Sequence, residues 1–175
     1  KQDKLKMKFV KVQQKNFLEN VISNEDYKFL KTRLKNDGYE EWYFVVWFMT
    51  ATGARVSELL QIKAEHITAG HLDIYTKGGK IRRLYIPQIL KNEAVVWLRS
   101  KGISSGYIFL NRFGKRITTR GIAQQLKHFA DKYGLKREVV YPHSFRHRFA
   151  KNFLDRFNDI ALLADLMGHE SIETT

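Results

Sequence analysis

Five basic side chains, spread over four short motifs, have the chemistry to hold and break one phosphodiester bond. They are Arg55, Lys77, His143, Arg146 and His169. A guanidinium group binds phosphate oxygens through two parallel hydrogen bonds and keeps its charge at neutral pH. An imidazole exchanges protons near neutral pH, and an ammonium group can protonate an oxygen that is gaining negative charge. These residue types therefore fit chemistry at a phosphate group.

The first two of these residues stand at predicted turns. Arg55 comes shortly after Gly53, at a predicted corner between two helices, from which its side chain can project into a cleft. Glu58 lies three residues later and can support Arg55 by pairing with it and fixing its rotamer. Lys77 stands at the mouth of a predicted hairpin whose turn is Gly78-Gly79. Each residue alone also fits a plainer role, as an ion-paired arginine or a solvated turn lysine.

The other three residues stand at predicted helix ends. His143 and Arg146 are three apart in a first helical turn, so they face the same way, where a helix N-terminus attracts anions. His143 and His147 are also four apart, which would suit a metal, but a metalloprotease helix has Glu where Ser144 stands. No metal site is therefore predicted. His169 follows a predicted helix C-terminus, whose dipole favours a charged imidazole; a simple capping role is the alternative.

The composition favours a polyanionic partner. The chain of 175 residues has 31 Lys and Arg and 18 Asp and Glu, so its formal net charge is +13. Nucleic acid is the commonest partner of such a chain, although a basic enzyme could use this charge for solubility alone. The chain has no cysteine, which excludes a disulfide scaffold, a thiolate nucleophile and a cysteine zinc site. It has no apolar run long enough to span a bilayer and no signal peptide, so we expect a cytoplasmic protein.

The elements that must position these residues are mostly helices, so we expect a mainly α fold with a small antiparallel β-sheet (α+β). Residues 40–50 are apolar on almost every side and predict a central buried helix. Residues 107–110 fit either a short strand or an extended loop. Residues 1–16 form a predicted basic arm or linker, and 17–175 one domain. Further helices are predicted over residues 24–35, 56–62, 91–100, 119–133, from 142 past 153, and 160–167, with another beginning at 171, and strands over 71–75 and 81–86.

Taken in order, the four motifs resemble the catalytic domain of the tyrosine recombinases, the phage-integrase family. Residues 52–59 (TGARVSEL) are similar to the first arginine motif of the family, and 76–82 (TKGGKIR) to its hairpin lysine motif. Residues 143–147 (HSFRH) resemble the H-x-L-R-H signature, with Phe145 in place of the usual Leu, and 166–169 (LMGH) resemble the last histidine motif. The resemblance covers roughly residues 17–175.

The resemblance implies a site-specific recombinase that cuts and rejoins double-stranded DNA through a 3′-phosphotyrosyl intermediate. Arg55 and Arg146 would hold the scissile phosphate, and His169 would bond one of its oxygens. His143 would help to take the proton of the attacking tyrosine, and Lys77 would protonate the leaving 5′ oxygen. The nucleophilic tyrosine would lie just beyond Thr175. No cofactor or metal is implied, but a homo-oligomer is, normally a tetramer on DNA, of phage or mobile-element origin and nucleoid-associated.

Further residues are predicted to contact DNA, from basic stretches and from the signature motif. Arg82 and Arg83 alternate on a predicted strand, so at least one should reach solvent or DNA. Arg148 replaces a small residue that is usual in the family and could add a phosphate contact. The full set is Lys80, Arg82, Arg83, Arg116, Arg120, Ser144 and Arg148.

Three other functions remain open at the level of the sequence. A DNA-binding module without catalysis would need no nucleophile. A type IB topoisomerase shares the logic of the site but relaxes DNA instead of joining two sites. An unrelated basic hydrolase is disfavoured, because the chain has no acid pair, metal motif or serine elbow.

Overall fold

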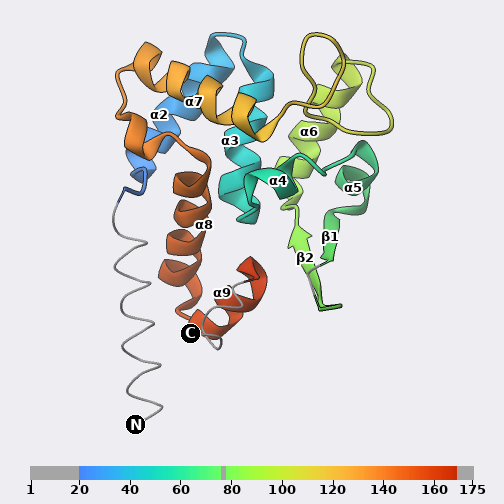
Figure 1. The fold of residues 1–175 in the computed structure, drawn as a ribbon, viewed down its shortest axis with the longest axis vertical. Coiled ribbons are helices and arrows are strands. Elements are labelled where there is room, and N and C mark those ends of the chain that lie inside the picture. Colours follow the sequence, from blue (N-terminus) through green and yellow to red (C-terminus); the bar gives the residue numbers. More distant parts are fainter. Residues whose placement is uncertain (1–19, 76–77, 169–175) are drawn as a thin grey trace.

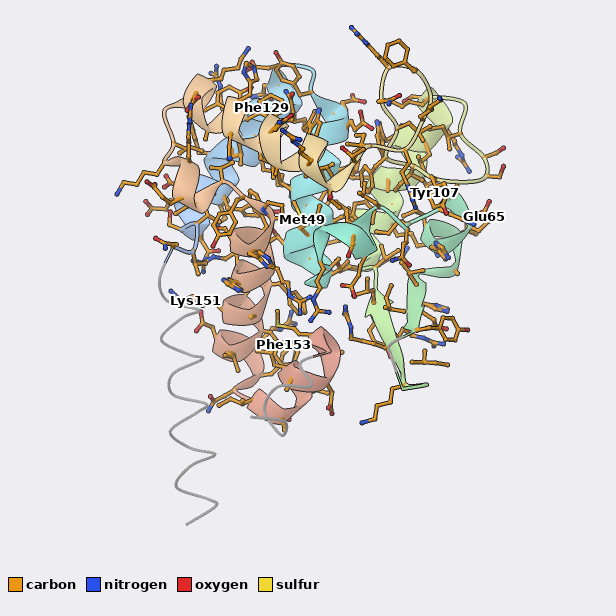
Figure 2. The ribbon with its side chains drawn as sticks, viewed as in Figure 1. Met49, Glu65, Tyr107, Phe129, Lys151 and Phe153 are labelled. Carbon is orange, nitrogen blue, oxygen red and sulfur yellow. The ribbon has the colours of Figure 1, made fainter. Side chains whose placement is uncertain are left out.

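Helix α3 (Glu40–Thr52) is central and buried, as its apolar sequence predicts. The computed structural model describes residues 20–75 and 78–168. Within them α3 packs against α2 (Asn24–Asn36), α6 (Gln88–Ser100) and α8 (Pro142–Phe157), as Figure 1 shows. Met49 of α3 lies near the middle of the molecule (Figure 2) and is fully buried. A helix that is apolar on all sides needs such neighbours on all sides.

Local signals in the sequence set several helix ends. Ser23 caps α2 by accepting the Asp26 N–H, and Thr118 caps α7 (Thr119–Tyr133) by accepting the Gly121 N–H at 2.9 Å. Pro142 occupies the first turn of α8, where its missing N–H costs nothing. Helix α9 (Ile160–Met167) ends at Gly168. These ends agree with the prediction, whereas α6 begins at Gln88 instead of residue 91, with Pro87 in its N-cap position.

The small antiparallel sheet consists of β1 (His71–Tyr75) and β2 (Ile81–Tyr85). Its turn includes Gly78 and Gly79, whose φ values of 109° and 78° suit glycine. Residues 107–110 join no sheet and make only isolated bridges, so the extended-loop alternative is right. The predicted α+β class is therefore confirmed.

Three short helices and α9 complete the described fold. The short helices are α4 (Val56–Leu59), α5 (Ala64–Ala69) and the 3-10 helix η1 (Arg137–Val139). Helix α9 contacts both α8 and β2, and Phe153 of α8 packs against its apolar side (Figure 2). In the described part of the chain, no helix is long and apolar enough to cross a membrane. The predicted basic arm and the helix from residue 171 lie outside the described residues, as do Lys77 and His169.

Candidate active site

A close contact between α3 and α8 fixes the backbone before Arg55. Helix α3 ends at Gly53, which has a left-handed φ of 71°. A Cβ atom on Gly53 would lie 2.5 Å from Cδ1 of Phe149, a side chain of α8. Only glycine fits there, so the backbone of the first arginine motif lies directly against the helix that carries His143 and Arg146.

Glu58 joins three arginines that come from three different elements. Its side chain is buried, and Arg82 Nη2 on β2 donates a hydrogen bond to its Oε2 atom. Arg55 Nη1 lies 3.6 Å from Glu58 Oε2, and Arg146 Nη1 of α8 lies 3.8 Å from Oε1. The Arg55 backbone N–H also donates to Oε1 at 2.8 Å. The fold therefore brings Arg55, Glu58 and Arg146 together, with Arg82 as a fourth member.

The cluster carries an excess of positive charge. Three guanidinium groups face one carboxylate, which leaves two positive charges without a counter-charge in this group of four. Burial lowers the pKa of Arg146 to about 9, and the charge of Arg55 adds to this effect while Glu58 opposes it. Arg146 therefore stays cationic at neutral pH. Arg55 is 42% exposed, so a solvent-borne anion can reach the cluster through it.

Arg146 also connects the ends of two helices. Its Nη1 donates to the Gly53 carbonyl at 2.8 Å, and its Nη2 donates to the Met167 carbonyl at 2.6 Å. Two bonds do not exhaust the five N–H donors of a guanidinium. Met167 stands two residues before His169 in the sequence.

The two histidines of the signature motif have different surroundings. His143 is exposed in the first turn of α8, and its ring centroid lies 6.1 Å from that of the half-buried His147. Burial lowers the pKa of His147 to about 4, and positive charge on His143 and Arg146 contributes. His147 is therefore neutral at pH 7. Among the described residues, no three potential ligands of the His, Cys, Asp and Glu types gather as a metal site requires.

Two residues predicted as DNA contacts instead hold the chain before α2. Ser144 Oγ accepts the N–H of Ile22 at 2.9 Å, and Arg148 Nε donates to the Ile22 carbonyl at 2.8 Å. Both residues are buried, so in the described structure they contact the chain before α2 and present little surface to a DNA partner. Their spacing of four on one helix places them on the same face, which in α8 is turned inward.

Arg82 and Arg83 point to opposite faces of the sheet, as neighbouring residues on a strand do. Arg82 is buried, so it too is not a surface contact, and its role in the cluster was missed. Its register offered a signal, because Arg82 shares the inward face of β2 with buried Leu84 and so needed an acidic partner. Arg83 is exposed and pairs with Asp73 across the sheet at 2.8 Å, which raises the pKa of Arg83. At least one of the two reaches solvent, as predicted.

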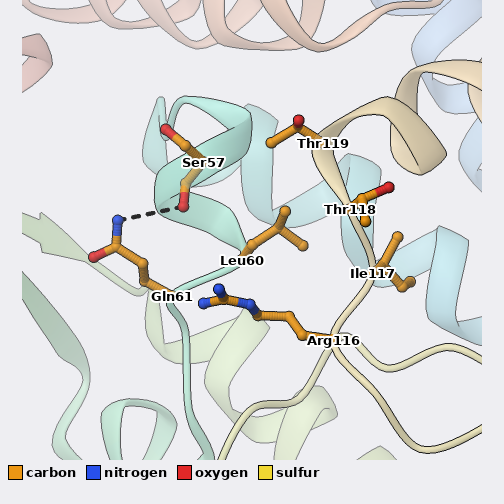
Figure 3. Close-up of a pocket in the computed structure, with 7 residues that line it drawn as sticks. All are labelled: Ser57, Leu60, Gln61, Arg116, Ile117, Thr118 and Thr119. Atoms are coloured by element: carbon orange, nitrogen blue, oxygen red, sulfur yellow. Dashed lines mark hydrogen bonds between the residues drawn. The ribbon is translucent and has the colours of Figure 1, made fainter.

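The remaining basic residues predicted to contact DNA are exposed. Lys80, Arg116 and Arg120 all have exposed side chains. Arg116 lines a groove of about 410 Å³ between α4 and the start of α7, together with Ser57, Leu60, Gln61, Ile117, Thr118 and Thr119 (Figure 3). Gln61 Nε2 donates to the Ser57 carbonyl at one side of this groove (Figure 3). The groove therefore combines apolar surface with several polar side chains and one basic side chain, Arg116, and it borders the helix that follows Arg55.

Comparison with known proteins places the chain in a family. The profile of the phage integrase family matches residues 18–175, so the chain belongs to that family. The tyrosine recombinase XerA of Pyrococcus furiosus is 37% identical over 137 residues, which are 75% of this chain and 47% of that protein. XerC of Pseudomonas entomophila is 33% identical over 133 residues, which are 71% of this chain and 43% of that protein. The chain thus spans less than half the length of these relatives.

Solved structures confirm the fold of the recombinase catalytic domain. The crystal structure of XerA recombinase gives a TM-score of 0.74 at 23% identity and covers 87% of this chain and 57% of that one. XerH recombinase bound to its difH substrate in a pre-cleavage complex gives 0.72 at 22% identity, covering 90% of this chain and 49% of that one.

Proposed function

We propose that this chain is the catalytic region of a tyrosine-type site-specific recombinase, which cuts and rejoins double-stranded DNA through a 3′-phosphotyrosyl link. The observation that carries the proposal is the cluster of Arg55, Arg82 and Arg146 around one buried carboxylate. A phosphodiester is an anion of the right size and charge to offset part of this excess. Family membership and the recombinase relatives support the same activity.

In this proposal, each site residue acts on one part of the phosphodiester. The exposed guanidinium of Arg55 meets a non-bridging oxygen first, and Arg146 adds its charge from behind. Both stabilise the charge that grows on the phosphate in the transition state. His143, at the exposed start of α8, takes the phenol proton as the tyrosine oxygen bonds to phosphorus and the 5′ oxygen leaves. One phosphodiester-type bond replaces another, so the reaction needs no ATP.

The other catalytic residues stay predictions. Lys77 would give its proton to the leaving 5′ oxygen, and His169 would bond a phosphate oxygen, but both lie outside the described residues. The nucleophilic tyrosine is expected just beyond Thr175. Side chains supply every positive charge in this scheme, so neither a metal nor a cofactor is part of the proposal.

We further propose that the exposed basic residues follow the DNA backbone on either side of the cleaved bond. Lys80 and Arg83 lie at and beside the start of β2, Arg116 lines the groove beside α4, and Arg120 is exposed in the first turn of α7. Recombination joins two cut duplexes, so the working unit would be a homotetramer on DNA. Such an enzyme would act at the nucleoid in the cytoplasm, and a phage or mobile element is the proposed source.

Replacing Arg55 tests the proposed function. In the full-length protein, we expect Arg55→Ala to lower the rate of covalent adduct formation on nicked DNA by at least about 10²-fold, as for removal of one oxyanion donor. DNA binding should weaken only modestly, because the backbone contacts remain. Arg137→Ala is the matched control, since Arg137 is exposed and paired with Asp131.

Near-normal adduct formation by Arg55→Ala would contradict the proposal. DNA binding by the wild-type protein without any adduct would favour a binding module instead. Relaxation of supercoiled plasmid without site preference would favour a topoisomerase.

A further inference from the structure

We infer that Arg82 is a positioning residue of the active site, which holds Glu58 in a rotamer that keeps Arg55 available to the phosphate. The inference rests on the proposed function. Arg82 lies on β2, on the inward face of the sheet, and is only 6% exposed. Its effect on the reaction would therefore pass through the residues that it contacts.

The two arms of the Arg82 guanidinium reach two different elements. Nη2 donates to Glu58 Oε2 in α4, and Nη1 donates to the Leu166 carbonyl in α9 at 3.2 Å. Strand β2 continues from the hairpin of Lys77, α4 follows Arg55, and α9 leads to His169. One planar, rigid fork thus connects the three segments that carry predicted catalytic residues.

The end of α9 is fitted closely to Arg82. Gly168 has a left-handed φ of 68°, and a Cβ atom on it would lie 2.7 Å from Arg82 Nε and 2.8 Å from Cδ. Any larger residue at 168 would have to displace the arginine side chain. The end of α9 therefore leaves no space beside Arg82 for a side chain at position 168.

Arg82 also determines how Glu58 shares its two oxygens. Oε2 takes the bond from Arg82, and Arg55 Nη1 stays 3.6 Å from the same oxygen, beyond hydrogen-bond distance. Oε1 accepts the backbone N–H of Arg55. If Arg82 were lost, Oε2 would be open to Arg55, whose guanidinium could then move within hydrogen-bond distance of it. Arg82 thus competes with Arg55 for one carboxylate oxygen and leaves the Arg55 guanidinium free to meet an anion.

A purely stabilising role explains this arrangement less well. Among the described residues, Arg82 Nε has no hydrogen-bond partner although it is buried, and an unmet buried donor costs stability. Leu84, two residues on, fills the same inward face with an apolar side chain. Replacing a buried ion pair with apolar groups is often neutral or stabilising. An arginine at this position is therefore better explained by the positioning of Glu58 and Arg55 than by a contribution to stability.

The test uses Arg82→Lys, which keeps the positive charge but loses the two-armed fork. Inorganic phosphate is titrated into the protein while the arginine Nε–H signals are followed by ¹H–¹⁵N NMR. We expect Arg82→Lys and Arg82→Met each to raise the Kd for phosphate about tenfold, since a misplacement of about 1 Å has large effects at such sites. The Nε–H signal of Arg55 should shift before phosphate is added, because its partner has changed. Arg137→Met, which removes a charge from an exposed ion pair with Asp131, should leave both readouts near wild type.

Each outcome decides between the two proposals. A folded Arg82→Lys protein with wild-type phosphate Kd and an unmoved Arg55 signal would overturn the role of Arg82. If Arg82→Met does not fold, Arg82→Lys gives the answer, and loss of folding in both would assign Arg82 to stability alone. If the wild-type protein binds no phosphate, the proposed function fails, while the Arg55 signal in the Arg82 variants still tests the positioning role.

Discussion

Glu58→Gln removes the negative charge at the centre of the arginine cluster while it keeps the shape of the side chain. The carboxylate is 5% exposed and lies 3.6 Å and 3.8 Å from the Arg55 and Arg146 guanidinium nitrogens, with a hydrogen bond from Arg82. At an effective dielectric constant of about 20, each such pair contributes about 4 kcal/mol of Coulomb energy before desolvation is subtracted. The substitution leaves three guanidinium groups facing each other without a counter-charge.

We expect Glu58→Gln to lower the free energy of unfolding by about 3–5 kcal/mol, the usual cost of removing one partner from a buried ion pair. Urea unfolding at pH 7, followed by tryptophan fluorescence, measures the loss, because Trp97 is buried in the core and Trp42 and Trp47 pack against it. Glu93→Gln is the matched control, since Glu93 forms a partly exposed pair with Lys35 at 3.4 Å. An exposed pair of this kind contributes less than about 1 kcal/mol.

Added phosphate separates the charge effect from a packing effect. An anion that binds the folded protein raises its stability in proportion to RT ln(1 + [L]/Kd). Phosphate should stabilise Glu58→Gln more than wild type, since the cluster then has three positive charges and no carboxylate. A loss below about 1 kcal/mol, equal to that of Glu93→Gln, would refute the view that this carboxylate offsets the arginine charges.

Three further predictions concern packing, pH and salt. Gly53→Ala should lower the free energy of unfolding by more than about 2 kcal/mol, because the new methyl group would lie 2.5 Å from Phe149 and the backbone there is left-handed. Gly70→Ala is the control: Gly70 has a similar φ of 83° but open space around it, so this variant measures the backbone cost alone. The folded pKa of His147, about 4, lies below its unfolded value, so the unfolded chain binds the extra proton and stability is lost as pH falls from 6.5 to 4. That loss should be about 2 kcal/mol after allowance for solvent access. His147→Asn lacks this titrating group, so between pH 6.5 and 4 the wild type should lose about 2 kcal/mol more free energy of unfolding than the variant. Parallel pH–stability curves for the two proteins would contradict this. DNA affinity should fall about 10³-fold or more between 50 and 200 mM salt if six or more phosphates are contacted, and a flat titration would count against those contacts.

Features that depend on neighbouring residues could be predicted from the sequence. The caps at Ser23 and Thr118 and the helix start at Pro142 involve hydrogen bonds or φ restrictions within three residues, so local sequence determines them. The apolar stretch at residues 40–50 had to be buried on all sides, whatever packed against it. The residue types of the four motifs likewise indicated phosphate chemistry before any coordinates were known.

Contacts between distant residues could not be predicted in this way. Ser144 and Arg148 looked like members of a phosphate-binding motif, yet both bond to Ile22, more than 120 residues away. A hydroxyl or guanidinium binds phosphate and backbone equally well in chemical terms, so the sequence alone could not separate the two partners.

The sequence by itself determined which side chains this protein has for binding an anion, the order in which they occur, and the helices and strands that carry them. Only the tertiary structure decided that Glu58, besides its neighbour Arg55, would also contact Arg82 and Arg146, and that Arg82 would be buried while Arg83 stayed in solvent. The physical reason is that helix and strand patterns follow from contacts a few residues apart. Which residues pair with a buried carboxylate depends on how separate elements pack, because every buried charge needs a partner.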